Sequence, residues 1–244
     1  MCTVSFVPLM GNVLITASRD ERAGRPAAIP PRRYSLDCGD IIFPKDGEAG
    51  GTWFGLHTLG HAAVLLNGAW KNHVTRLPYL KSRGLVLLDI LNAKRPVDFF
   101  KQIDLEGIEP FTIVLWDGRI LQEGRWDGEQ KYFRTLDAGQ SHIWSSPTLY
   151  DASARSKRQK WFHEWLALHP TPNQKSILDF HLFAGEGDPA VDLKMNRNEK
   201  LFTVSITSLW MNKKEAGLVY LDLQNGRPAV SLDIIFSKKM VINQ

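Results

Sequence analysis

Alternating hydrophobic and polar residues, interrupted by turn-forming residues, predict a chain built largely of β-strands. Residues 3–7 and 13–17 carry this alternation on either side of a Pro-Leu-Met-Gly-Asn turn, which predicts an antiparallel hairpin. Residues 52–56 and 61–66 flank Gly60 in the same way and predict a second hairpin. The N-terminal third of the chain therefore contains at least two pairs of strands.

The same pattern continues in the middle and at the end of the chain. Asp-Gly pairs at 117–118 and 127–128 separate three strand-like runs between residues 111 and 136. Because Asp-Gly suits positions of positive φ, we expect tight type I′ turns at both pairs. Three further strands are predicted near the C-terminal end, at residues 201–211, 217–223 and 228–236.

Helical periodicity lies between these blocks of strands. It is strongest at residues 152–168, where Asp151 is a suitable N-cap and apolar residues recur on one face. Three shorter helices are predicted at 82–92, 96–103 and 174–183. No Gly/Ser linker or low-complexity segment divides the chain. We therefore expect one α+β domain over residues 1–244, with helices covering the faces of extensive antiparallel sheet.

Composition narrows the class of protein. A hydrophobic content of 43% with 23% charged residues is too apolar for intrinsic disorder. No apolar run reaches the ~18–20 residues of a membrane span, and the N-terminus lacks the pattern of a secretory signal. Two cysteines exclude a scaffold of several disulfides. These features predict a cytoplasmic protein without a membrane span.

The small positive charge does not indicate a particular partner. The formal net charge is +4, and the basic residues are spread along the chain apart from a cluster at residues 155–160. A nucleic-acid-binding surface would concentrate them on one face with interleaved aromatic residues. Because this cluster is more typical of a solvated helix face, we expect no nucleic-acid partner.

Cys2 directly follows the initiator methionine and becomes the first residue if that methionine is removed. Its α-amine, with a reference pKa of about 7.7–8.0, and its thiol, at about 8.5, then suit proton transfer near neutral pH. Such N-terminal nucleophiles support covalent catalysis, with the amine acting as the base. Position alone does not distinguish this role from a chance cysteine.

The first hairpin adds a second observation. If its paired positions sum to 21, Phe6 faces Ile15 and Cys2 faces Arg19. A guanidinium beside a thiol favours the thiolate. Asp20 could orient the arginine or accept a hydrogen bond from the new ammonium terminus. The alternative is a surface charge cluster at the end of a strand, and a slip of one residue would turn Arg19 to the other face.

Several short motifs follow one another in a fixed order: Met1-Cys2-Thr3, Ser18-Arg19-Asp20-Glu21, Ala49-Gly50-Gly51-Thr52-Trp53, Leu65-Leu66-Asn67-Gly68 and Lys81-Ser82-Arg83-Gly84. In this order they resemble the NRDE-motif family, also called the transport-and-Golgi-organisation family. The resemblance is dense over residues 1–90 and looser beyond, where Thr207-Ser208 matches a Thr/Ser-rich stretch of the family. One residue departs from the pattern, because Ser18 stands where the family usually has Asn.

The family is similar to N-terminal-nucleophile (Ntn) hydrolases of the choloylglycine hydrolase and penicillin acylase type. This resemblance implies a four-layer αββα sandwich with largely antiparallel sheets. It implies that the Cys2 thiolate attacks an amide or thioester carbonyl, with Arg19 and Asp20 tuning and orienting the nucleophile. Asn67 is the candidate oxyanion-hole donor, through its backbone or its side chain. Ser18 and Trp53 are the candidate substrate-binding residues.

The resemblance also leaves a second function open. Relatives of this family are linked to haem, acyl-coenzyme A or lipid, so the chain could be a non-catalytic carrier of such a molecule. In either case the partner is a small-molecule substrate or ligand, and we expect neither a metal nor a cofactor. His57 and His61 flank a predicted turn and lack an evident third ligand. Cys38 lies between acidic residues, which favour an inert thiol.

Overall fold

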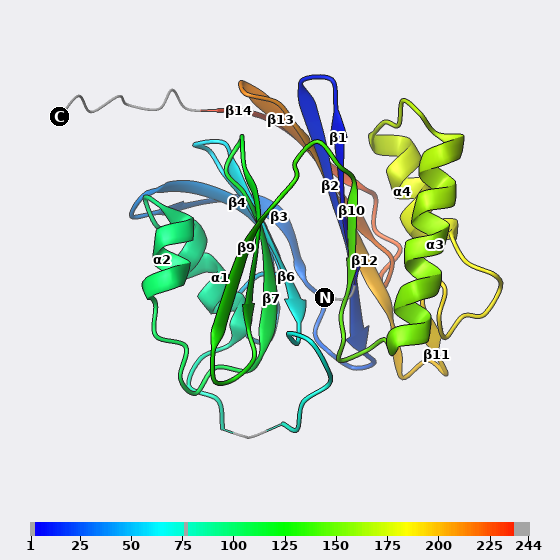
Figure 1. Ribbon diagram of the computed structural model, residues 1–244, viewed down its shortest axis with the longest axis horizontal. Coiled ribbons are helices and arrows are strands. Elements are labelled where there is room, and N and C mark those ends of the chain that lie inside the picture. Colours follow the sequence, from blue (N-terminus) through cyan, green and yellow to red (C-terminus); the bar gives the residue numbers. More distant parts are fainter. Residues whose placement is uncertain (1–2, 76–77, 237–244) are drawn as a thin grey trace.

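The predicted strands assemble into two antiparallel sheets stacked face to face (Figure 1). A pair of helices covers the outer face of each sheet, so that the order of layers is helices, sheet, sheet, helices. The computed structural model describes residues 3–75 and 78–236. This arrangement is the four-layer αββα sandwich expected from the sequence.

The first sheet joins the two ends of the chain. Its strands lie in the order β10 (His142–Ser145), β1 (Thr3–Leu9), β2 (Asn12–Arg22), β12 (Leu201–Met211), β13 (Glu215–Asp222) and β14 (Val230–Ile235), and the short β11 (Asn196–Arg197) pairs with β12. The N-terminal hairpin therefore lies at the centre of this sheet, between β10 and β12.

The second sheet follows the order of the sequence. Its strands are β3 (Ile29–Leu36), β4 (Gly39–Lys45), β5 (Phe54–His57), β6 (His61–Asn67), β7 (Phe111–Trp116), β8 (Leu121–Trp126) and β9 (Lys131–Leu136). Each strand pairs with the next one along the chain, so the sheet is a meander.

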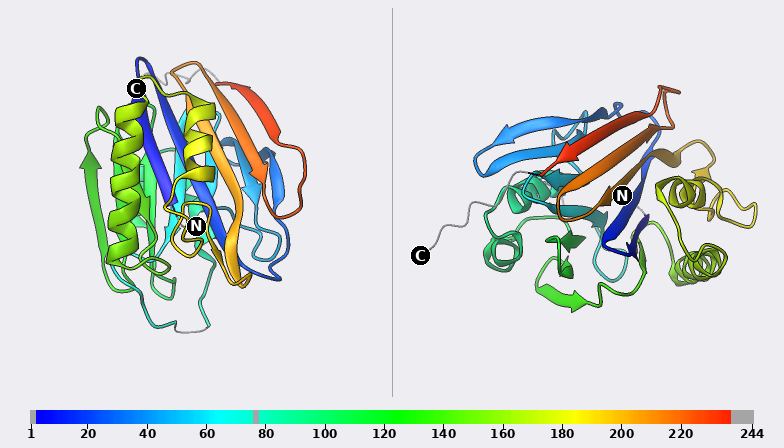
Figure 2. Two further views of the ribbon diagram at one scale, coloured as in Figure 1. Left: turned by 90° about the vertical axis from the view of Figure 1, so that its right-hand side faces the viewer. Right: turned by 90° about the horizontal axis from the view of Figure 1, so that it is seen from above.

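The helices begin at the capping residues that their sequences supply. Ser82 caps α1 (Arg83–Leu91), Asp151 caps α3 (Ala152–Leu168), and Asn173 forms a capping box at α4 (Gln174–Phe183). The short α2 (Pro96–Gln102) has proline at its first position. Figure 2 shows α3 and α4 lying over the first sheet. Helices α1 and α2 pack on the second sheet.

Three apolar layers hold the sandwich together. Between the sheets, Phe6 and Ile15 of the first sheet meet Phe54 and Leu56 of the second. A second layer joins the outer face of the second sheet to α1 and α2, and a third joins the first sheet to α3 and α4. Because side chains alternate along a strand, each strand of the N-terminal hairpin contributes to two of these layers at once.

The predicted hairpin register is confirmed over the described residues. Phe6 pairs with Ile15, and the pairing extends to Thr3, which lies opposite Ser18. Gly11, at φ +78°, supplies the left-handed backbone that the short turn after Leu9 requires. Cys2 lies outside the described residues, and with it the predicted pairing of Cys2 with Arg19.

Two details of the second sheet differ from expectation. The type I′ turns are wrong, because four residues connect the strands at 117–120 and 127–130 and positive φ occurs only at the glycines. The Asp117 and Asp127 carboxylates instead accept backbone N–H groups two and three residues ahead. The β3–β4 pair was not anticipated, because two prolines and two arginines mask a strand that lies at the sheet edge, where proline is tolerated.

None of the described helices is long and apolar enough to cross a membrane. The longest, α3, has 17 residues and carries a predominantly polar sequence.

Candidate functional site

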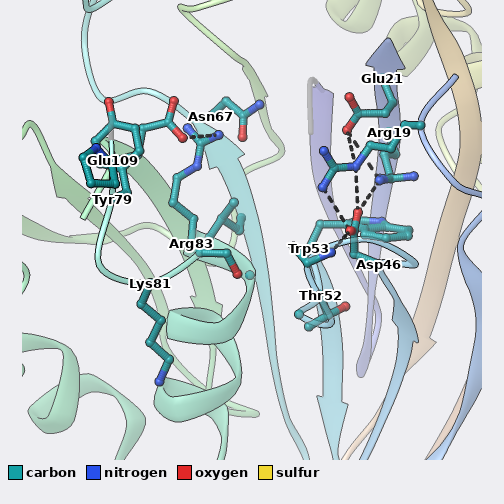
Figure 3. Close-up of a pocket in the computed structure, with 17 residues that line it drawn as sticks. Arg19, Glu21, Asp46, Thr52, Trp53, Asn67, Tyr79, Lys81, Arg83 and Glu109 are labelled. Carbon is teal, nitrogen blue, oxygen red and sulfur yellow. Dashed lines mark hydrogen bonds and ion pairs between the residues drawn. The ribbon is translucent and has the colours of Figure 1, made fainter. Parts of the chain in front are cut away.

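A cavity of about 610 Å³ opens between the two sheets where β2 and β6 end (Figure 3). Its walls come from four separate segments that the fold brings together. These are the end of β2, the connection from β4 to β5, the end of β6 with Glu109, and the start of α1 with the residues before it. Every motif that the sequence singled out in residues 18–84 contributes at least one residue to this lining.

Arg19 occupies the β2 side of the cavity and is almost completely buried, at 4% exposure. Its Nη2 lies 2.5 Å from Oδ2 of Asp46 and 3.4 Å from Oε2 of Glu21. Its guanidinium also lies over Trp53, with Cζ 4.3 Å from the ring centroid. An arginine held by two carboxylates and an aromatic face is a fixed positive charge, with little freedom to turn away.

Asp46 is the residue that organises this side of the cavity. In addition to Arg19, its carboxylate accepts hydrogen bonds from Arg25 at 2.9 and 3.1 Å and from the backbone of Ala49 at 2.7 Å. Burial alone would raise the pKa of this carboxyl group. The hydrogen bonds from Arg25 and Ala49, with the charge of Arg19, outweigh burial and lower its pKa. Asp46 is therefore ionised at neutral pH and anchors both arginines.

Two glycines bring the opposite wall into position. The backbone N–H of Thr52 donates to the carbonyl of Gly84 at 3.1 Å. A Cβ on Gly51 would lie 2.4 Å from the carbonyl carbon of Gly84, and one on Gly84 would lie 2.8 Å from the oxygen of Thr52. Only glycine permits this approach, which docks the start of α1 against the loop before β5.

That docking presents Arg83 to the cavity. Arg83 pairs with Glu109 at 2.9 Å and donates to the carbonyl of Pro110 at 3.1 Å. Tyr79 and Lys81 line the same side. The cavity thus has charged groups on both walls and an apolar floor that includes Trp53 and Leu65.

Asn67 lies at the last position of β6, between the two walls (Figure 3). Its carbonyl accepts a hydrogen bond from Ser146 at 2.8 Å. The next residue, Gly68, has φ +77° and donates to the carbonyl of Pro110 at 2.9 Å, so the chain turns sharply there. Among the described residues, none is hydrogen-bonded to the Asn67 side-chain amide, which leaves its N–H groups available to a ligand.

Ser18 and Asp20 lie on the opposite face of β2 because side chains alternate along a strand. Ser18, expected to contact substrate, is not part of the cavity lining; its hydroxyl is 2.8 Å from Nδ1 of His181 in α4. Asp20 accepts hydrogen bonds from Tyr150 at 2.5 Å and Thr203 at 2.6 Å. Asp46, not Asp20, therefore contacts and orients Arg19, and Ser18 does not face the cavity.

The helix-covered face of the hairpin carries an unusually polar interior. His181 bridges the hydroxyls of Ser5 and Ser18, each at 2.8 Å. Arg158 of α3 is completely buried; its Nη1 donates to Thr3 at 2.5 Å and its Cζ lies 3.5 Å from the centroid of the Tyr150 ring. Burial, aided by the charge of Arg158, lowers the pKa of His181 to about 3, so the ring is neutral.

His57, His61 and Cys38, to which the sequence analysis gave no functional role, lie in or beside turns of the second sheet. His57 and His61 face each other across the β5–β6 hairpin and stack with their centroids 4.4 Å apart. Within residues 3–75 and 78–236, no group of three or more His, Cys, Asp or Glu side chains is arranged to hold a metal. Cys38 is a half-buried free thiol in the turn between β3 and β4.

Sequence reasoning did not identify Asp46, Arg25 or Glu109 as site residues. Asp46 follows an unpredicted strand, and its partner Arg19 is 27 positions away. A signal was available in Arg83, which the Lys81–Gly84 motif contains but to which no role was given. A predicted contact between the Gly50-Gly51 motif and Gly84 would have placed Arg83 beside the cavity.

Solved structures with a similar fold include two kinds of hydrolase. An N-acylethanolamine-hydrolyzing acid amidase ortholog from Caenorhabditis elegans matches with a TM-score of 0.59 and 12% identity, over 85% of this chain and 92% of its own. The C2A mutant of conjugated bile acid hydrolase from Clostridium perfringens matches with a TM-score of 0.58 and 11% identity, over 96% of this chain and 92% of its own. A second variant of that hydrolase gives 0.58 and 12%, over 99% of both chains.

These likenesses confirm the Ntn-hydrolase-like fold that the sequence motifs implied. No curated protein matches the sequence of the chain. The sequence pattern of the Transport and Golgi organisation 2 family matches residues 1–163, which is more than half of the chain. The chain therefore belongs to the Transport and Golgi organisation 2 (TANGO2) family.

Proposed function

We propose that this protein is an amidohydrolase or acyltransferase that uses Cys2, freed by removal of Met1, as an N-terminal nucleophile. The proposed substrate is an amide or a thioester that binds in the cavity between the sheets. Two fold relatives support this class of reaction: one is an acid amidase and the other a hydrolase of conjugated bile acids. The mutant form of the latter replaces a cysteine at position 2, the position that Cys2 has here.

The observation that carries the proposal is the register of the N-terminal hairpin. Thr3 pairs with Ser18, and the same register continued by one residue would set Cys2 against Arg19. Arg19 lies on the cavity face of β2 and is fixed there by Asp46. A thiol beside this guanidinium would have a lowered pKa and a larger thiolate fraction at neutral pH.

The reaction then needs few additional groups. The α-amine takes the proton of the thiol, and the thiolate attacks the carbonyl carbon of the substrate. The new carbon–sulfur bond forms as the bond to the leaving amine or thiol breaks, and the proton passes from the α-ammonium to that leaving group. Water, or an acceptor amine, then attacks the acyl-enzyme thioester and regenerates the thiol.

Asn67 is suited to stabilise the oxyanion that forms during both attacks. Its side-chain amide is not engaged by any described residue, and it lines the cavity between the Arg19 and Arg83 walls. One preorganised donor of this kind is worth about 2.7–4 kcal/mol of transition-state stabilisation. Asp20, on the other face of β2, is left to accept from the α-ammonium group rather than to orient Arg19.

Two measurements test the proposal. Intact-mass spectrometry of the native protein should show that Met1 is absent, and retention of Met1 would exclude the mechanism. Iodoacetamide should alkylate Cys2 faster than Cys38, with the Cys38→Ala variant as the matched control that leaves only one thiol. Preferential alkylation of Cys38 would also contradict the proposal.

The second candidate is a non-catalytic carrier of haem, acyl-coenzyme A or lipid in the same cavity. The described lining contains no His, Cys or Met, and Tyr79 is a lining side chain of a type that can ligate haem iron. If haem is the ligand, adding haemin should produce a Soret band that Cys2→Ala or Tyr79→Phe abolishes. Absence of a Soret shift would remove haem from consideration.

A further inference from the structure

A second cleft, of about 420 Å³, lies between β8, β9 and β10 and the start of α3. Its lining includes three arginines, Arg125, Arg134 and Arg155, together with His142 and the hydroxyls of two serines. None of the described residues that line it is Asp or Glu. The two cavities share no described lining residue. They lie on opposite sides of the end of β6, where Leu66 lines this cleft and Leu65 and Asn67 line the other.

One buried carboxylate holds two of these arginines in place. Glu123, at 2% exposure, accepts two hydrogen bonds from Arg125 at 2.9 and 3.0 Å and two from Arg134 at 2.9 and 3.1 Å. It also accepts from Nε1 of Trp144 at 2.7 Å. Burial would raise the pKa of Glu123, but the two arginines and Trp144 outweigh it and lower the pKa to about 2. The carboxylate is therefore charged, and it holds the guanidinium groups of Arg125 and Arg134 in fixed orientations.

The charges in this cleft do not balance. Glu123 supplies one negative charge against Arg125 and Arg134. The third arginine, Arg155, has no carboxylate partner among the described residues and makes only a 3.3 Å contact from Nε to the Asp151 carbonyl. The cleft therefore retains about two uncompensated positive charges.

Hydrogen-bond donors remain available within this field. In the described chain, Nη1 of Arg134 and both terminal nitrogens of Arg155 donate to no other group. The basic residues of segment 155–160, which form one cluster in the sequence, point to different sides of α3. Arg158 is buried and Lys157 pairs with Glu186, so Arg155 is the one basic residue of this segment that lines the cleft.

We propose that this cleft binds the phosphate group of a small molecule. A phosphate monoester carries a charge of about −1.5 to −2 at neutral pH, which matches the uncompensated charge better than the single charge of a carboxylate. Its three terminal oxygens accept the forked donors of several guanidiniums at once. The lining is mainly polar, so it fits the phosphate end of such a ligand better than an acyl chain. This site is independent of Cys2 and of the proposed reaction.

Titration calorimetry with phenyl phosphate, inorganic phosphate and benzoate tests the site. We expect saturable binding of phenyl phosphate at one site per chain, and binding of benzoate at least about tenfold weaker. Inorganic phosphate that binds as well as phenyl phosphate identifies the free anion as the ligand, whereas a clear preference for phenyl phosphate identifies a monoester. Equal affinity for benzoate and phenyl phosphate, or no saturable heat with either phosphate, overturns the proposal.

Matched variants locate the binding. Arg155→Gln and Arg134→Gln should each weaken phenyl phosphate binding about tenfold or more, because each removes charge-assisted hydrogen bonds. Both side chains are at least partly exposed, so glutamine fits at either position. Arg119→Gln removes the same charge from an exposed turn of the same sheet and should leave the affinity unchanged. Equal losses in all three variants would show a general charge effect and contradict the site.

Discussion

The two faces of the N-terminal hairpin differ in what their polar residues do. On the cavity face, Arg19 is held by Asp46 and Glu21 beside a space large enough for a ligand. On the helix face, Ser18 and Asp20 are buried under α3 and α4 and bonded to His181, Tyr150 and Thr203. Four consecutive residues thus serve two environments, because neighbours on a strand point to opposite sides.

Because of this difference, substitutions of neighbouring residues on β2 should have different effects. The helix face is a buried hydrogen-bond network in which each lost partner leaves a buried polar group unsatisfied. The cavity face borders a space large enough for a ligand, and its fixed charge has a chemical role in the proposed reaction. We therefore expect changes on the helix face to reduce stability first, and changes on the cavity face to alter reactivity first.

The largest effect is expected for Arg158→Met on the helix face. This change leaves the hydroxyl of Thr3 and the carbonyls of Val191 and Asp192 without their donor, at a cost of about 3 kcal/mol in the free energy of unfolding. Urea unfolding measures it. The control is Lys160→Met on the same helix, where an exposed pair with Glu164 at 3.7 Å is worth no more than about 0.5 kcal/mol. Similar losses in both variants would contradict a special role for the buried network.

The next largest effect is a pH dependence of stability that originates at His181. Its pKa is about 3 in the folded protein and near 6.5 when unfolded, so below pH 6.5 only the unfolded state binds the proton. Stability should therefore fall as pH decreases from 6.5, by about 1.7 kcal/mol between pH 6.5 and pH 5.

Unfolding curves at pH 6.5 and pH 5 isolate this contribution. Glu123, whose pKa falls from 4.5 to about 2 on folding, loses its stabilisation only below the lower pH of that range. Burial also lowers the pKa of His57, so the informative quantity is the difference between the wild type and His181→Gln. If His181→Gln has the same pH slope as the wild type, the neutral, buried state of His181 is refuted.

On the cavity face, Arg19→Gln should change reactivity more than stability. Removing the guanidinium should raise the pH midpoint of Cys2 alkylation by about one unit, because the thiolate loses a neighbouring positive charge. The pH profile of the iodoacetamide reaction, measured with Cys38→Ala in the background, reports this shift. Arg22→Gln, on the same strand but with its side chain 66% exposed, should leave the profile unchanged. If the midpoint does not move in Arg19→Gln, Arg19 does not influence the Cys2 thiol.

The smallest effect is expected for Trp53→Phe. The indole Nε1 is buried without a hydrogen-bond partner among the described residues, so its removal costs nothing in lost bonds. Phenylalanine also keeps an aromatic face beneath Arg19. The free energy of unfolding should fall by only about 1 kcal/mol, from the smaller ring. A loss above about 2 kcal/mol in urea unfolding would show that the indole does more than support the arginine.

The sequence predicted much of the fold because local signals and packing agree. The strand 201–211 and the helix 152–168 occur with the expected bounds, since alternation, periodicity and capping residues mark both. The β3–β4 pair escaped prediction because a sheet edge tolerates the prolines and charges of β3. The turns at Asp117 and Asp127 were misassigned because Asp-Gly also suits longer loops in which the carboxylate accepts backbone N–H groups.

Only the part of the candidate site that lies on the N-terminal hairpin was predictable from the sequence. The hairpin register, confirmed from Thr3 to Leu9, is local, and it is the basis for the prediction that Arg19 faces position 2. The identity of its partner depends on where the β4–β5 connection passes, and no short-range pattern specifies that contact between sheets. Ser18 illustrates the opposite case: its place in a motif suggested a contact with substrate, whereas its strand position directs its side chain to His181 of α4.

An acylating probe tests the central claim, that Cys2 is a nucleophile served by Arg19, most directly. A β-lactone probe is incubated with the native protein and with Cys2→Ala, and the adducts are located by intact-mass and peptide mass spectrometry. The account predicts one acyl adduct, on an N-terminal peptide that begins with Cys2, and no adduct in Cys2→Ala. An adduct that persists in Cys2→Ala, or that maps to Cys38, would contradict it.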